Sequence, residues 1–212
     1  MSLSHPARSG TVMKAFEGAQ RLPTRAAELF IRRDFLTAAD CAALIERIDA
    51  RRRPSGLADH DGDPGFRTSE TCDLDAADPF VMGVVTRLAA YAGLDVAHAE
   101  PLQGQRYAVG QEFKAHTDYF EPSGVDYERY CAVAGQRSWT LMVYLNVPGA
   151  GGATRFKRLD KTFQPETGKL LAWNNRNADG SPNAMTLHPG MPVRAGTKYI
   201  ITSWFRDRPW PR

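Results

Sequence analysis

The chain has 212 residues, of which 42% are hydrophobic and 24% charged, and its 27 basic residues exceed its 24 acidic ones by a net charge of +3. These values describe a globular protein of about one domain, and they exclude a disordered or fibrous chain. The small net charge argues against nucleic acid as a partner. No stretch of the sequence is apolar for long enough to predict a membrane span.

Residues 1–23 mix serine, glycine, proline and charged side chains without periodicity, so we expect a flexible amino-terminal segment. This segment lacks the apolar stretch of a secretory signal. Residues 24–212 are then interpreted as a single domain. The three cysteines are widely spaced and form no disulfide or thiolate-metal pattern, which favours a reducing, cytoplasmic location.

Two helices are predicted in the first half of the chain. Apolar residues at spacings of three and four predict a helix over residues 38–52. A second helix is expected to begin at Asp78, with a proline in its first turn, and to end before Gly93. Between the helices, residues 54–66 are rich in glycine and aspartate and are expected to form an exposed loop.

The second half of the chain has the residue patterns of strands. Dense β-forming runs cover residues 140–147 and 198–205, and a shorter run covers residues 170–173. Helices at the front and strands at the back predict a mainly β fold with flanking helices (α+β), either a sandwich or a jelly roll.

His116 and Asp118 are candidate metal ligands, because residues i and i+2 of an extended segment point to the same side. His188 is the candidate third ligand. Two histidines and one carboxylate form the ligand set of the facial-triad non-haem iron(II) oxygenases, which keep open positions for a 2-oxo acid and O2. Lys198 lies in a strand whose alternate positions face the interior, where the distal carboxylate of 2-oxoglutarate could pair with it. From spacing alone, a surface hydrogen-bonded pair and an edge-strand charge remain alternatives.

Three segments, RYAVGQEFKAHTDYF, TLMVYLNVPGAGGATRF and TLHPGMPVRAGTKYIITSWFRDRPW, resemble the motif blocks of one known family in order and spacing. This family is the prolyl 4-hydroxylase branch of the iron(II)/2-oxoglutarate-dependent dioxygenases. The upstream segments PGFRTSETC and AEPLQGQRY are similar to that branch as well. The resemblance implies a double-stranded β-helix (jelly roll) core over about residues 100–208, supported by amino-terminal helices.

The resemblance also implies roles for individual residues. The iron(II) ligands and catalytic residues would be His116, Asp118 and His188. The residues that hold 2-oxoglutarate would be Lys198, Tyr107, Thr154 and Tyr144. The substrate side would comprise Arg137, Trp204, Arg206, Arg67 and Phe113. O2 is the second co-substrate of such enzymes, and ascorbate is a candidate reductant.

One of these positions departs from what is common in the family, and a second differs from some of its members. Arg206 stands where some members have histidine, and Phe113 stands where members commonly have tyrosine. The hydroxyl missing at Phe113 leaves the identity of the substrate open, and its ring predicts a hydrophobic pocket wall.

The activity implied is hydroxylation of prolyl residues at C4 in a peptide or protein, with release of succinate and CO2. Residues 54–66 and 121–136 are expected to close over the substrate. Three alternatives remain open: hydroxylation of a free amino acid or another small molecule, a non-catalytic metal-binding jelly roll, and a nucleic-acid demethylase on the same fold.

Overall fold

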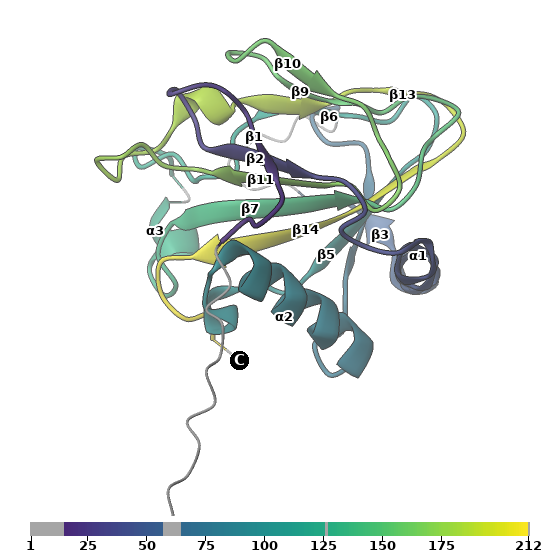
Figure 1. Ribbon diagram of the computed structural model, residues 1–212, viewed down its shortest axis with the longest axis horizontal. Helices are drawn as coiled ribbons and strands as arrows, with labels where there is room; N and C mark the ends of the chain where they lie inside the picture. Colours follow the sequence, from purple (N-terminus) through teal and green to yellow (C-terminus); the bar gives the residue numbers. More distant parts are fainter. Residues whose placement is uncertain (1–14, 57–64, 126, 212) are drawn as a thin grey trace, which may run out of the picture.

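The computed structural model describes residues 15–56, 65–125 and 127–211 (Figure 1). The larger of its sheets has eight strands in the order β1-β2-β11-β7-β14-β5-β4-β3. In that order they are β1 Gln20–Arg21, β2 Leu29–Arg32, β11 Leu170–Asn174, β7 Arg137–Tyr144, β14 Lys198–Arg206, β5 Gln103–Tyr107, β4 Glu70–Asp73 and β3 Arg53–Pro54.

A four-stranded sheet has the order β10-β9-β12-β6. Its strands are β10 Lys161–Phe163, β9 Thr154–Phe156, β12 His188–Gly190 and β6 Phe113–His116, and a separate pair joins β13 Val193–Ala195 to β8 Ala150–Gly151. The helices are α1 Ala38–Arg51, α2 Pro79–Ala92 and the short α3 Tyr127–Cys131, with 3-10 turns η1 Val96–His98 and η2 Ala184–Thr186. The predicted mainly β fold with flanking helices is confirmed.

Both predicted helices form, and their ends are set by side chains next to them. At the start of α1, Thr37 Oγ1 accepts a hydrogen bond from the Asp40 amide at 3.0 Å, and the Asp40 carboxylate accepts one from the Thr37 amide at 3.2 Å. This reciprocal pair satisfies two amides that have no partner within the helix. The Asp78 side chain caps α2, and Gly93 ends it with a φ of 66°.

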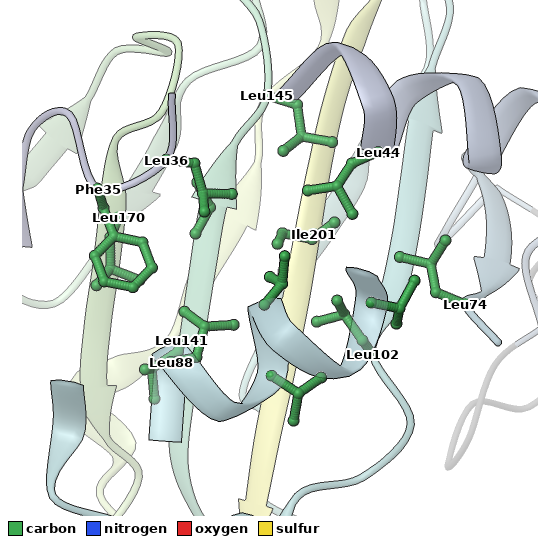
Figure 2. Close-up of a cluster of buried hydrophobic side chains, with 14 of the residues drawn as sticks. Phe35, Leu36, Leu44, Leu74, Leu88, Leu102, Leu141, Leu145, Leu170 and Ile201 are labelled. Carbon is green, nitrogen blue, oxygen red and sulfur yellow. The ribbon is translucent and has the colours of Figure 1, made fainter. Parts of the chain in front are cut away.

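Helices α1 and α2 pack against one face of the large sheet (Figures 1 and 2). Leu44 of α1 and Leu88 of α2 meet Leu141 of β7 and Ile201 of β14 in a buried hydrophobic cluster (Figure 2). Gly104 of β5 permits the close approach of α1, because a Cβ there would lie 2.3 Å from Ile48 Cγ1. The helices therefore cover one face of the sheet and leave the other face to the small sheet.

A second hydrophobic cluster lies on that other face of the large sheet. Side chains alternate along a strand, so Met142 and Tyr144 of β7 and Ile200 of β14 belong to this cluster, whereas their sequence neighbours face the helices. Phe156 of β9 joins them from the small sheet. The space between the two sheets is thus lined by alternate residues of the central strands, which include Lys198.

Residues 15–23 differ from the sequence expectation of a flexible segment. Strand β1 pairs with β2, with Gln20 opposite Ile31. Phe16 stacks on Phe30 with ring centroids 4.2 Å apart, and Leu22 is buried. The expectation is wrong here because two apolar side chains cover the sheet, which periodicity over so short a segment does not reveal. Residues 1–14, and 57–64 of the expected loop 54–66, lie outside the described residues.

Within the described ranges, every helix is too short or too polar to cross a membrane.

Candidate metal and co-substrate site

Strands β6 and β12 bring two histidines together. His116 and His188 are register partners in this antiparallel pair, and their ring centroids lie 4.5 Å apart. Asp118 follows the end of β6, and its Oδ1 lies 3.9 Å from His116 Nε2. One ligand atom from each of the three residues lies within 4.8 Å of the others, so together they could hold one metal ion. The structure thus brings together the residues that the sequence singled out.

Each histidine is oriented by a hydrogen bond at Nδ1. His116 Nδ1 lies 2.8 Å from the Lys114 carbonyl oxygen, and His188 Nδ1 lies 2.8 Å from the Thr186 carbonyl oxygen. Because a carbonyl only accepts, each Nδ1 donates and each Nε2 keeps its lone pair for a metal. Burial and the nearby His188 lower the pKa of His116 to about 3, which keeps this imidazole neutral and able to ligate.

Asp118 is fixed by a chain of hydrogen bonds from the large sheet. Thr140 Oγ1 donates to Asp118 Oδ2 at 2.8 Å, and Asn175 Nδ2 donates to Thr140 Oγ1 at 2.9 Å. Burial by itself would raise the pKa of Asp118, but His188, His116, Arg137 and the bond from Thr140 outweigh it and lower the pKa below its usual value. The carboxylate is therefore ionised. Thr140 and Asn175 were not among the residues predicted from the sequence.

Lys198 lies in the same cavity as the three candidate ligands. It is 1% exposed and sits opposite Tyr107 in the pairing of β14 with β5. Its ammonium lies 4.8 Å from the centre of the Tyr107 ring and 5.6 Å from that of Tyr144. Burial lowers the pKa of Lys198 to about 7. No carboxylate of the described residues lies within ion-pair distance of Lys198, so the cavity has a cation in need of an anion.

Buried hydroxyl groups complete the surroundings of Lys198. Tyr107 and Thr154 line the cavity, whereas Tyr144 lies behind Thr154 and donates a hydrogen bond to its Oγ1 at 2.7 Å. The Tyr107 hydroxyl donates to Gln105 Oε1 at 2.6 Å. Burial raises the pKa of both tyrosines, so these hydroxyls stay protonated. The cavity therefore offers a cation and neutral hydrogen-bonding groups, which suit a carboxylate.

An outer cleft of about 850 Å³ opens over His116 and Asp118. All of the expected substrate-side residues line it: Arg67, Phe113, Arg137, Trp204 and Arg206. Phe113 stacks on His116 with ring centroids 3.5 Å apart, and the Arg67 guanidinium lies 4.9 Å from the centre of the Phe113 ring. Phe113 thus forms an apolar wall next to the candidate metal site.

Glu100 joins two of the arginines in this cleft. Arg137 donates to both carboxylate oxygens of Glu100, at 2.6 and 2.7 Å, and Arg206 Nη1 lies 3.2 Å from Glu100 Oε1. The Arg137 guanidinium also stacks on Trp204, with its central carbon 4.0 Å from the centre of the ring. Arg206 donates a hydrogen bond to the Tyr130 carbonyl oxygen in α3. Glu100 was not among the residues predicted from the sequence, although buried arginines require a carboxylate nearby.

Residues 102–206 match the family model of the 2OG-Fe(II) oxygenase superfamily. The chain belongs to this superfamily. The family predicted from the sequence is confirmed, and with it come Fe(II), 2-oxoglutarate and O2 as cofactors. Two histidines of fixed orientation, one ionised carboxylate and a buried lysine are a donor set that fits these groups.

Prolyl 4-hydroxylases are among the curated relatives of this oxygenase. Prolyl 4-hydroxylase subunit alpha-1 of Rattus norvegicus is 31% identical over 166 residues, which are 75% of this chain and 31% of that protein. A putative prolyl 4-hydroxylase of Acanthamoeba polyphaga mimivirus is 31% identical over 150 residues, 69% of this chain and 61% of that protein. The chain thus spans less than two thirds of the length of these relatives.

Solved prolyl hydroxylases share the fold. The 2OG complex of the viral collagen prolyl hydroxylase from Paramecium Bursaria Chlorella virus-1 has a TM-score of 0.65 and 25% identity, and the match covers 84% of this chain and 95% of that one. A Pseudomonas putida prolyl-4-hydroxylase has a TM-score of 0.55 and 20% identity over 85% of this chain and 92% of that chain. The predicted jelly-roll architecture is confirmed.

Proposed function

We propose that this 2OG-Fe(II) oxygenase hydroxylates prolyl residues at C4 in a peptide or protein. The main support for the proposal is that the inner cavity and the outer cleft share lining residues. The inner cavity contains Lys198 and the three candidate ligands, and the open outer cleft meets it at His116 and Asp118. A cleft of about 850 Å³ is large enough to hold several residues of a peptide. Prolyl 4-hydroxylases are among the curated relatives, which supports proline as the target.

In this proposal, His116, Asp118 and His188 would hold iron(II). Lys198 binds the distal carboxylate of 2-oxoglutarate, with Tyr107 and Thr154 beside it and Tyr144 orienting the Thr154 hydroxyl. When bound, iron(II), 2-oxoglutarate and O2 supply the oxidation of an unactivated C–H bond, with release of succinate and CO2. The protein supplies orientation and a cavity that excludes water.

The outer cleft would hold the substrate with its target carbon near the ligands. Phe113 offers an apolar surface beside His116, which suits the aliphatic ring of proline. Trp204 lines both the cleft and the cavity, and Arg137, held by Glu100, keeps the indole in place through its stacking.

Closure by residues 121–136 and 54–66 stays a prediction, as do a need for ascorbate and a cytoplasmic location. The three cysteines are free and buried, which is compatible with a reducing compartment.

The competing function is hydroxylation of a free amino acid, which needs a closed pocket with a counter-charge for the substrate's carboxylate. The volume of the cleft, about 850 Å³, is much larger than a free amino acid needs, which favours a peptide over this alternative. Mass spectrometry separates the two when the protein, with iron(II) and 2-oxoglutarate, is incubated either with proline-containing peptides or with free proline. We expect a gain of one oxygen on peptide proline and a matching amount of succinate.

The matched variants for this experiment are Asp118→Asn and Asp160→Asn. Asp118→Asn and His116→Ala should abolish succinate formation, because each removes a proposed ligand. Asp160 has an 87% exposed side chain remote from the cavity lining, so its variant should keep full turnover. Robust turnover in His116→Ala or Asp118→Asn would overturn the assignment, and hydroxylation of free proline alone would favour the competing function.

A further inference from the structure

We propose that the outer cleft takes a peptide with a carboxylate close to the hydroxylated residue, and that Arg67 binds this carboxylate. The inference rests on the proposed prolyl hydroxylation and specifies its substrate class. It follows from the charges that line the cleft and from the partners that each of them has.

Among the described residues, the hydrogen-bond partners of the Arg67 guanidinium are all neutral. Its Nη2 donates to Gln103 Oε1 at 2.8 Å and to Thr71 Oγ1 at 3.1 Å, and its Nε donates to Ser69 Oγ at 3.3 Å. Among the residues that the structure describes, no carboxylate lies within ion-pair distance of Arg67. The side chain is half-buried, and burial lowers the pKa of Arg67, even though Asp118 and Asp73, beyond ion-pair distance, favour its charged form. A guanidinium in this position gains most from an anion that arrives with the ligand.

Arg67 lies close to the candidate metal site, so an anion bound to it would lie near the reacting centre. Its guanidinium lies 4.9 Å from the centre of the Phe113 ring, and Phe113 stacks at 3.5 Å on His116. One aromatic ring therefore separates the cation from a candidate iron ligand. A carboxylate bound to Arg67 would lie within the reach of a neighbouring residue of the same peptide.

The rest of the described cleft lining also has more positive than negative charge. Glu100 is the shared partner of both Arg137 and Arg206, so two guanidinium groups face one carboxylate. The other charged residues lining the cleft are Arg53, Arg129, Glu121 and Asp118. Of these, Arg53 pairs with Asp73 at 2.5 Å, and Asp118 is a proposed metal ligand. Among the described residues, the cleft lining therefore has a surplus of positive charge, which an acidic peptide offsets and a neutral one does not.

The carboxylate has two possible sources, an aspartate or glutamate side chain and the carboxyl terminus of the peptide. A peptide panel distinguishes them. Peptides of equal length place Glu, Gln or Lys on either side of one proline, and each is made with a free and with an amidated carboxyl terminus. Affinity is measured by fluorescence anisotropy with labelled peptides, and kcat/KM is measured from hydroxylated product.

We expect the Glu peptide to bind at least about tenfold more tightly than its Gln counterpart, an advantage that added salt reduces. If the terminal carboxylate is the anion, the free terminus instead of the side chain gives the advantage. Arg67→Gln should remove most of the acidic-over-neutral ratio in both affinity and kcat/KM, and Arg67→Lys should restore part of it. Arg53→Gln is the control, because Arg53 lines the same cleft but already has Asp73 as its partner, and it should keep the ratio.

Two results would overturn the inference. The first is that the unaltered protein binds peptides with and without the carboxylate equally tightly. The second is that Arg67→Gln weakens the binding of acidic and of neutral peptides by the same factor. Failure of the proposed function gives a different pattern. In that case acidic peptides still bind through Arg67, but none gains oxygen. Hydroxylation of Gln and Glu peptides at equal rates and affinities, with no difference between free and amidated carboxyl termini, would retain the proposed function and reject this inference alone.

Discussion

Lys198 and Tyr107 are register partners on adjacent strands, and the Lys198 ammonium lies 4.8 Å from the centre of the Tyr107 ring. The aromatic face partly compensates for burial of the cation, but no carboxylate of the described residues does so. The pair therefore marks the end of the cavity at which an anionic co-substrate is stabilised.

Replacement of Lys198 should separate co-substrate binding from metal binding. Lys198→Met keeps the apolar stem and removes the charge, so we expect the apparent KM for 2-oxoglutarate to rise by about tenfold or more, while iron content stays near that of the unaltered protein. Succinate assays over a range of 2-oxoglutarate concentrations and metal analysis check this. Lys161→Met on the exposed strand β10 is the control. Equal losses of iron and of 2-oxoglutarate binding would contradict the assigned role.

The low pKa of Lys198 predicts a pH dependence of stability. The folded-state pKa of about 7 lies below the ordinary value of 10.5. Between these pH values the unfolded chain binds one more proton than the folded chain, so without 2-oxoglutarate the free energy of unfolding should rise with pH across this window. Denaturant titrations should show this component in the unaltered protein and lack it in Lys198→Met.

The same group should take up a proton when the co-substrate binds. Above about pH 7 the lysine is largely neutral, and the carboxylate of 2-oxoglutarate favours its charged form. Calorimetry near pH 8, without O2 and in buffers of different ionisation enthalpy, should register this proton uptake. An identical proton count in the unaltered protein and in Lys198→Met would show that another group is responsible.

Thr140 should affect metal affinity without touching the metal. Thr140→Val removes the hydrogen bond to Asp118 Oδ2 and leaves the Asn175 amide without its acceptor. Loss of such an orienting partner typically weakens metal binding by about 10- to 100-fold. Titration with a spectroscopically visible divalent metal measures the effect. Thr162→Val on the exposed strand β10 is the control, and metal affinity equal to the unaltered protein's would show that Asp118 does not depend on Thr140.

Glu100 should be a large contributor to the stability of the cleft wall. Glu100→Gln leaves Arg137 and Arg206 largely buried beside a neutral side chain, which should cost about 3 kcal/mol of unfolding free energy. Chemical denaturation checks the value. Asp160→Asn breaks an exposed ion pair with Arg155 and should change stability little, because solvent screens that pair. A similar small effect in Glu100→Gln would mean that solvent reaches the buried pair as well.

Local patterns predicted the elements that have strong local signals. Helices α1 and α2 follow from their caps and apolar stripes, and strands β7, β11 and β14 follow from dense β-forming runs. The short strands β2 and β4 have four residues each, too few for a periodic signal, and β5 carries polar side chains because it faces the cavity. The pairings that bring these strands into the large sheet are long-range and have no signature in the local sequence.

In the candidate site, too, residues with a local sequence signal were predicted and residues that depend on long-range contacts were not. The spacing of His116 and Asp118 within one segment was informative, since extended backbone places them on one side. Thr140 looks like an ordinary β-forming residue within its run. Its role depends on the folded chain, in which β7 places Thr140 within hydrogen-bond distance of Asp118. Glu100 likewise gains its partners from Arg137 and Arg206, which are distant in the sequence.

The chemistry of this protein depends on the register of strand β14 with its neighbouring strands. Lys198 at one end and Trp204 near the other line the cavity, about 20 Å apart along the strand. A shift of β14 by one residue would exchange every one of its cavity side chains for those that now face α1 and α2, such as Ile201. The helices on the far face therefore do more than stabilise the fold. By holding Ile201 and Phe205, they decide which residues the co-substrate and the substrate meet.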